Sequence, residues 1–183
     1  VANTHDTLLC FSSYGKVYWI KVYRLPRGGR NAKGRPIVNL LPLEKDERIQ
    51  AVLPVKEFND DQFIFMATET GSVKKTKLSA YSRPMKSGIK AIKLRDGDRV
   101  VNAEITDGTK EIMLFSNSGK SIRFKESDAR PMGRVSQGVR GMRIDKDQKI
   151  ISLVVLEEGN ILVATENGYG KQTLKDEFSI QKR

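Results

Sequence analysis

The strongest constraint on the fold of this chain is a repeated unit anchored by a turn glycine. The first copy reads Phe11-Ser12-Ser13-Tyr14-Gly15-Lys16, and the third reads Phe115-Ser116-Asn117-Ser118-Gly119-Lys120. The second and fourth copies place Gly71 and Gly168 at the same point. The four glycines are 56, 48 and 49 residues apart. A period of about 50 residues predicts supersecondary units that stack or are arranged radially.

Each complete unit contains four short apolar runs separated by turn residues, which predicts four β-strands per unit. Runs of about five residues that are rich in Val, Ile and Phe and bounded by Gly, Asn or Asp are typical of strands. No long stretch keeps the period of an amphipathic helix. The runs are residues 8–12, 17–24, 37–43 and 49–55; 63–68, 73–78, 89–94 and 100–105; 112–116, 121–125, 139–144 and 150–156; and 161–165 and 171–174.

Four strands per unit and a regular repeat predict an all-β, propeller-like fold built from four-stranded blades. The units are residues 6–60, 61–109, 110–158 and 159–183, which is about three and a half blades of one domain. Because the last unit holds only two runs, we expect the chain to be a piece of a longer array.

Positive charge follows the same repeat. The formal net charge is +11, from 33 Lys and Arg against 22 Asp and Glu. Residues 15–36 contain seven basic residues and no acid, and residues 71–95 contain eight and no acid. Residues 119–143 contain seven with two acids, and residues 168–183 contain four with two acids. Repeated units would align these segments on one surface, and such a surface attracts a polyanion.

The residues that catalysis or metal binding would need are scarce. His5 is the only histidine, and one histidine supplies neither a multi-histidine metal site nor a convincing Ser/His/Asp triad. Residues 29–36 have the glycine spacing of a phosphate-binding loop, but Arg35-Pro36 stands where Lys and Ser or Thr are required. Cys10 and Trp19 lie in apolar runs, so we expect a buried thiol and a core indole rather than a base-stacking platform. We therefore expect this fragment not to be an enzyme and to hold no metal or cofactor.

The composition also bears on the compartment. A single cysteine cannot form an internal disulfide, which is typical of a reducing cytoplasm. No apolar run approaches the roughly 18 residues that would span a bilayer. A cytoplasmic location is therefore expected.

Several phrases of the sequence resemble one known family. The stretch Gly34-Arg35-Pro36-Ile37-Val38-Asn39-Leu40-Leu41-Pro42-Leu43-Glu44 closely resembles the C-terminal domain of DNA gyrase A. Val1-Ala2-Asn3-Thr4-His5-Asp6, Val73-Lys74-Lys75-Thr76, Phe124-Lys125-Glu126-Ser127 and Asn167-Gly168-Tyr169-Gly170-Lys171 are similar to it as well. The resemblance covers essentially the whole chain. It implies a β-pinwheel whose neighbouring blades exchange strands, and a basic rim around which DNA wraps.

The resemblance also implies what the longer protein does. It would be a bacterial, nucleoid-associated type II topoisomerase that introduces negative supercoils, assembled as a heterotetramer with gyrase B. ATP and Mg²⁺ would bind to other domains. The partner of this fragment would be double-stranded DNA, largely independent of its sequence, because phosphate contacts carry no base information.

The predicted DNA-binding residues lie on the second strand of each unit and on the loop after it. In residues 121–125 apolar and charged side chains alternate, so we expect Arg123 and Lys125 to point away from the core. The full predicted set is Arg24, Arg27, Arg30, Lys33, Arg35, Lys74, Lys75, Lys77, Arg83, Lys86, Lys120, Arg123, Lys125, Arg130, Arg134 and Arg140.

One departure from the family and two alternatives stay open. The family's Gln-Arg-Arg-Gly-Gly-Lys-Gly box is absent, and Arg27-Gly28-Gly29-Arg30 lies out of phase with it. We therefore expect this fragment alone to bend DNA incompletely. The alternatives are the similar C-terminal domain of topoisomerase IV and a propeller-like scaffold that binds an acidic protein. An enzyme built on a propeller is disfavoured by the lack of a catalytic cluster.

Overall fold

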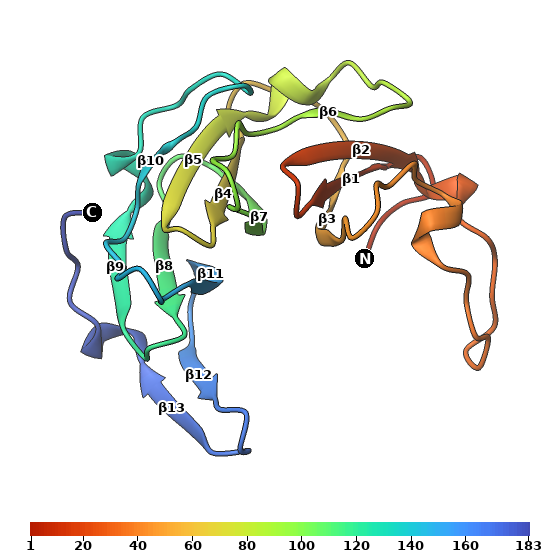
Figure 1. Cartoon of the computed structure of the whole chain (residues 1–183). Helices are drawn as coiled ribbons and strands as arrows, with labels where there is room; N and C mark the ends of the chain where they lie inside the picture. The colour runs from red at the N-terminus through yellow and green to blue at the C-terminus, as the bar shows by residue number, and fades with distance from the viewer.

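The computed structural model describes residues 1–183 and contains short strands, turns and five 3-10 helical turns. The sheets follow one another along an open arc, with the N-terminal unit at one end and the C-terminal unit towards the other (Figure 1). The fold is all-β, as predicted. The strands are β1 (Thr7–Ser12), β2 (Lys16–Lys21), β3 (Ile49–Val55), β4 (Phe63–Thr68), β5 (Ser72–Lys77), β6 (Ile89–Lys90), β7 (Val100–Thr106), β8 (Glu111–Ser116), β9 (Ser121–Lys125), β10 (Val139–Arg140), β11 (Ile150–Leu156), β12 (Asn160–Ala164) and β13 (Gly170–Leu174).

The 3-10 turns occupy equivalent places in the repeat. In each unit one of them follows the second strand directly, and a further one lies later in the first unit. They are η1 (Val22–Arg24), η2 (Ile37–Asn39), η3 (Leu78–Tyr81), η4 (Glu126–Asp128) and η5 (Lys175–Glu177).

Neighbouring units exchange a strand. The two four-stranded sheets have the orders β3-β1-β2-β6 and β10-β5-β4-β7, and in each the outermost strand comes from the following unit. Val17 of β2 pairs with Ile89 of β6, and Val73 of β5 pairs with Val139 of β10. The inner strands β3, β7 and β11 lie beside one another, on the concave side of the arc (Figure 1). The strand exchange that the resemblance implies is therefore present.

The prediction of a strand at residues 37–43 is wrong. That segment contains η2 and pairs with no strand. Its counterparts β6 and β10 each pair with the second strand of the unit before them, whereas residues 37–43 belong to the first unit. The predicted strands at 89–94 and 139–144 are also too long, because only two residues of each form a ladder.

The core lies between adjacent sheets rather than inside any one of them. On β4, Ile64 and Met66 pack into a cluster shared with the first unit, while Phe65 and Ala67 pack into a cluster shared with the third unit. Alternate side chains of a strand point to opposite faces, so β4 must be apolar on both faces. This explains why its sequence is an unbroken apolar run.

The last two sheets are incomplete. The third has three strands, β11-β8-β9, and the fourth has only β12-β13. The C-terminal segment runs beside β9, where Ile180 forms a single parallel bridge with Arg123. The bridge between Pro131 and Lys75 is its equivalent one unit earlier. Leu162 of β12 is 72% exposed, because no further sheet covers it.

Candidate nucleic-acid interface

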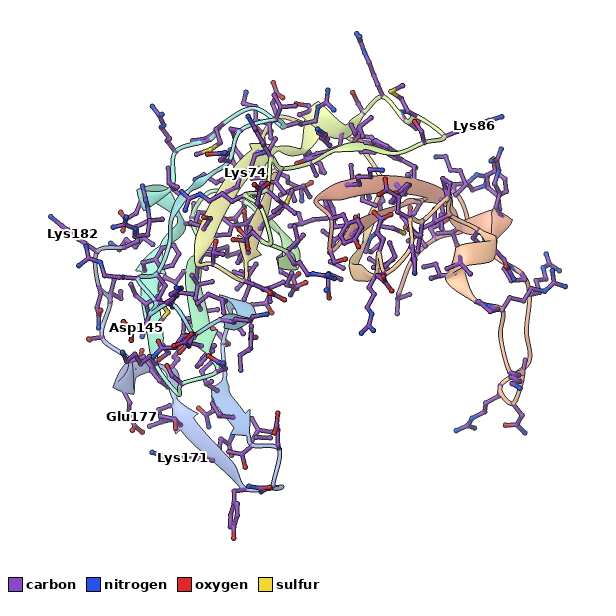
Figure 2. The ribbon with its side chains drawn as sticks, viewed as in Figure 1. Lys74, Lys86, Asp145, Lys171, Glu177 and Lys182 are labelled. Carbon is purple, nitrogen blue, oxygen red and sulfur yellow. The ribbon has the colours of Figure 1, made fainter.

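Most of the predicted DNA-binding residues lie in solvent on the loops that leave the second strands. The loop of the second unit runs along the outer side of the arc, and Lys86 points away from the ribbon at its tip (Figures 1 and 2). Arg134, on the equivalent loop of the third unit, is partly buried. The exposed members of the predicted set are Arg24, Arg27, Arg30, Lys33, Arg35, Lys77, Arg83, Lys86, Lys120, Lys125, Arg130 and Arg140.

The strand exchange brings loop cations to the outermost strands. Lys90 ends β6 and Arg140 ends β10, and both side chains are exposed. Because β6 and β10 are the outer edges of the two complete sheets, these cations lie on the convex side of the arc. Successive units therefore present cations along the same edge.

Ion pairs neutralise only two of the exposed residues in the predicted set. Lys77 pairs with Asp60 at 3.4 Å, and Lys120 pairs with Asp145 at 3.4 Å. Exposed pairs of this kind contribute about 0–1 kcal/mol, so a phosphate could compete for either lysine. The other exposed members have no carboxylate partner.

Lys74 is not a surface cation, contrary to the prediction. Its side chain is 0% exposed and lies inside the fold beside β5 (Figure 2). The ammonium group donates hydrogen bonds to the carbonyl oxygens of Ala91 and Arg134. Burial lowers the pKa of Lys74 to about 7, and the positive charge of Arg134 contributes to this lowering. A side chain held in this way cannot reach a phosphate.

Lys75 is also buried, so the prediction of a position on the surface is wrong for this residue as well. Its ammonium nitrogen donates to the Glu126 carbonyl oxygen at 3.1 Å and lies 3.7 Å from the Glu126 carboxylate. That carboxylate is itself buried and accepts hydrogen bonds from the Thr106 hydroxyl at 2.7 Å and the Lys110 amide at 3.0 Å. Lys75 therefore links the second unit to the third.

Arg123 is the third correction. We expected it to point outward, but it is only 8% exposed because residues 175–181 cover its face of β9. Its guanidinium donates to Glu111 Oε2 at 2.7 Å and to the carbonyl oxygens of Lys175 at 2.6 Å and Phe178 at 3.0 Å. Period-two alternation correctly gives the face of the sheet, but it does not say what covers that face.

The sequence reasoning missed that two of these donors share one position in the repeat with the partly buried Trp19. Trp19, Lys75 and Arg123 each lie four residues after the turn glycine. Trp19 Nε1 donates to the Tyr81 carbonyl oxygen at 2.9 Å, so all three donate to a carbonyl in or next to the 3-10 turn of the following unit. The sequence did contain a signal for this shared role, because the three residues lie at the same distance from the turn glycine. The signal is hard to recognise because the three side chains are chemically different.

His5, Cys10 and Trp19 are the other residues that the sequence singled out. His5 is exposed, and no group of three or more His, Cys, Asp or Glu side chains lies close enough together to hold a metal ion. Cys10 is buried, and burial raises the pKa of its thiol to about 11. Trp19 packs against the core cluster that the first and second units share, as predicted. The structure contains no helix that is long and apolar enough to span a membrane.

Comparison with known proteins gives one consistent family. The sequence matches the DNA gyrase C-terminal domain family, described as a beta-propeller, over residues 6–56, 62–107, 110–157 and 159–183. The DNA gyrase A protein of Salmonella typhimurium is 54% identical over 184 residues, which cover 100% of this chain and 21% of that protein. The chain thus spans about a fifth of the length of the curated relatives it matches.

Two solved structures share the fold. The C-terminal domain of DNA topoisomerase IV superposes with a TM-score of 0.90 at 32% identity, covering 99% of this chain and 57% of that one. The DNA gyrase A C-terminal domain superposes with a TM-score of 0.81 at 30% identity, covering 99% of this chain and 58% of that one.

Proposed function

Because the chain belongs to the DNA gyrase C-terminal domain family, we propose that it binds double-stranded DNA and wraps it around the convex edge of its sheets. The observation that carries this proposal is the repeated exposure of unpaired cations on the loops and exchanged strands of successive units. The cations lie along a curved path, so a duplex that bends along the arc brings further phosphates into contact with cations.

Electrostatics supplies the binding energy in this proposal. Each neutralised phosphate releases condensed counterions and contributes about −0.9 to the slope of log affinity against log salt. If about eight phosphates are neutralised, affinity falls by roughly four decades between about 50 and 200 mM salt. Bending 20–30 base pairs by 40–90° costs on the order of 1–6 kcal/mol, which the added phosphate contacts offset. Base specificity is expected to be low.

The role in the longer protein follows as part of the same proposal. The wrapped DNA would be presented to the catalytic part of a type II topoisomerase, where it supports ATP-dependent negative supercoiling. Gyrase B would be the partner in the assembly, and ATP and Mg²⁺ would bind outside this segment. The chain itself would contribute DNA binding and no catalytic group.

A linking-number assay tests the wrapping directly. A nicked plasmid is ligated, or a closed plasmid is relaxed by a type I topoisomerase, with the chain bound, and the protein is then removed. Wrapping leaves trapped supercoils that increase with protein concentration. A scaffold for an acidic protein would leave the topoisomer distribution unchanged, and that result would reject the proposal.

A charge-reversed variant tests whether the loops carry the binding. We expect Arg27, Arg30, Lys33 and Arg35 changed together to Glu to reduce trapped supercoils and to flatten the salt slope. The matched control changes Lys45, Arg48, Lys56 and Lys146 to Glu, because these exposed cations lie outside the four basic segments. The control has the same net charge. Equal losses in both variants would mean that only total charge matters.

A further inference from the structure

One junction between units departs from the charge pattern of the others. In the first and third units, the lysine after the turn glycine pairs with an acid near the third turn, as Lys16 with Glu44 and Lys120 with Asp145. In the second unit the lysine is replaced by Ser72 and the acid by Arg95.

Backbone hydrogen bonds establish that Glu44, Arg95 and Asp145 are equivalent. In each unit the amide three residues later donates to the carbonyl oxygen of this residue, at 3.1 Å for Glu44, 3.1 Å for Arg95 and 3.0 Å for Asp145. The second unit has therefore lost both partners of an ion pair and has gained a cation where the other units have an acid.

A polar cavity lies where the ion pair would be. It has a volume of about 500 Å³, and three arginines line it: Arg95 from the second unit, and Arg140 and Arg143 from the third. None of the three forms an ion pair. The carboxylate of Asp98 reaches the same turn, but it accepts hydrogen bonds from the Thr70 amide at 3.1 Å and hydroxyl at 2.7 Å. The residues that line the cavity thus include three arginines and no acid.

The backbone around the cavity is firmly held. The Gly71 carbonyl oxygen accepts hydrogen bonds from the Gly141 amide at 2.8 Å and the Met142 amide at 3.1 Å. Gly71 has a φ of +85°, and a Cβ at this position would lie 2.5 Å from the Met142 carbonyl oxygen. Only glycine fits there. Arg140 and Arg143 flank the two residues that this turn holds, so their Cα positions are fixed relative to Gly71.

We propose that this cavity is an oxyanion site that binds one phosphate group, and that, if the chain wraps DNA as proposed above, the group is a backbone phosphodiester of the duplex. Arginine suits this role because its planar guanidinium donates two parallel hydrogen bonds to a phosphate. A phosphate bound here contacts both units at once and fixes the path of the DNA across their junction. Arg95 and Arg143 thereby join Arg140 as phosphate ligands.

Inorganic phosphate is the probe for the site itself. In NMR titrations of the whole chain, phosphate should shift the amide signals of Gly71, Ser72 and Met142. The test variant combines Ser72→Lys with Arg95→Glu, which restores the ion pair of the sibling units and should therefore fold. It should lose these shifts. The absence of shifts in the wild type, or equal shifts in the variant, would overturn the site.

Duplex DNA distinguishes the source of the phosphate. Changing Arg95, Arg140 and Arg143 together to Gln should reduce the steepness of the salt slope by about 0.9 for one lost phosphate contact. The control Lys45, Lys56 and Lys146 to Gln should keep the wild-type slope. An unchanged slope alongside intact phosphate shifts would reject the DNA backbone as the source and identify a site for free phosphate. A wild type that binds phosphate but traps no supercoils would reject the wrapping proposal and leave the site standing.

Discussion

Three cations of the second strands and the cations of the loops after them are neighbours in sequence, yet their environments are opposite. Lys74, Lys75 and Arg123 are buried and donate to carbonyls or carboxylates of adjoining segments. Arg83 and Lys86 lie in solvent with no acidic partner. The difference teaches that a basic repeat segment has two parts, one that joins units and one that is free to meet an anion.

The largest expected effect comes from removing the counter-charge of a buried cation. Glu126→Ala leaves the Lys75 ammonium buried without a carboxylate and also leaves the Thr106 hydroxyl unpaired. Breaking a buried pair in this way costs about 3–5 kcal/mol, so the free energy of unfolding in urea should fall by that amount. Ser127→Ala, an exposed change in the same 3-10 turn, is the control. A loss below about 1 kcal/mol would mean that Lys75 is not a structural cation.

The next effect is a pH dependence that belongs to Lys74. Its pKa is lowered from 10.5 to about 7 by burial, so between these values the unfolded chain binds more protons than the native chain. Stability should therefore rise from about pH 7 to about pH 9, with a slope approaching about 1.4 kcal/mol per pH unit, and the contribution should be flat below it. Above about pH 9 the raised pKa of the Cys10 thiol opposes the rise. Denaturation at several pH values should show this rise in the wild type but not in Lys74→Met. Lys86→Met should keep the wild-type profile, and a rise that persists in Lys74→Met would assign it to another group.

The smallest effect on stability is expected in the loop. Arg83→Gln with Lys86→Gln removes two exposed charges that contact no acid, so the free energy of unfolding should change by less than about 0.5 kcal/mol. The same variant should flatten the salt dependence of DNA binding by up to about 1.8, or about 0.9 per lost phosphate contact. Thermal unfolding and a binding titration at several salt concentrations measure the two quantities. A large loss of stability would contradict the division of the basic residues into those that link units and those that are free to bind an anion.

Local pattern was sufficient for much of the fold. Strands β3, β4, β9 and β11 begin and end where the apolar runs predict, because their apolar side chains pack against neighbouring strands and units. The failure at residues 37–43 has a different origin. A strand edge forms only with a partner, and a run of apolar residues carries no information about whether that partner exists.

The candidate site was predicted in outline, but not in which cations are free. Charge periodicity correctly placed Arg83, Lys86 and Arg140 in solvent. It failed for Arg123, because alternation treats the charged face of a strand as solvent, whereas segments of the next unit cover that face here. The three-arginine cavity could not be inferred from charge counts, since it depends on contacts between residues that are far apart in sequence.

The exchanged strands give the chain a direction. The sheets of the first and second units gain their outer strands only from residues 89–90 and 139–140. During synthesis from the N-terminus, each sheet must therefore wait for the following repeat to leave the ribosome before its edge is covered. Each of these sheets would therefore be completed only after the next repeat has been synthesised. A translational pause within a loop would leave the outer strand edge of the preceding sheet exposed to unwanted pairing.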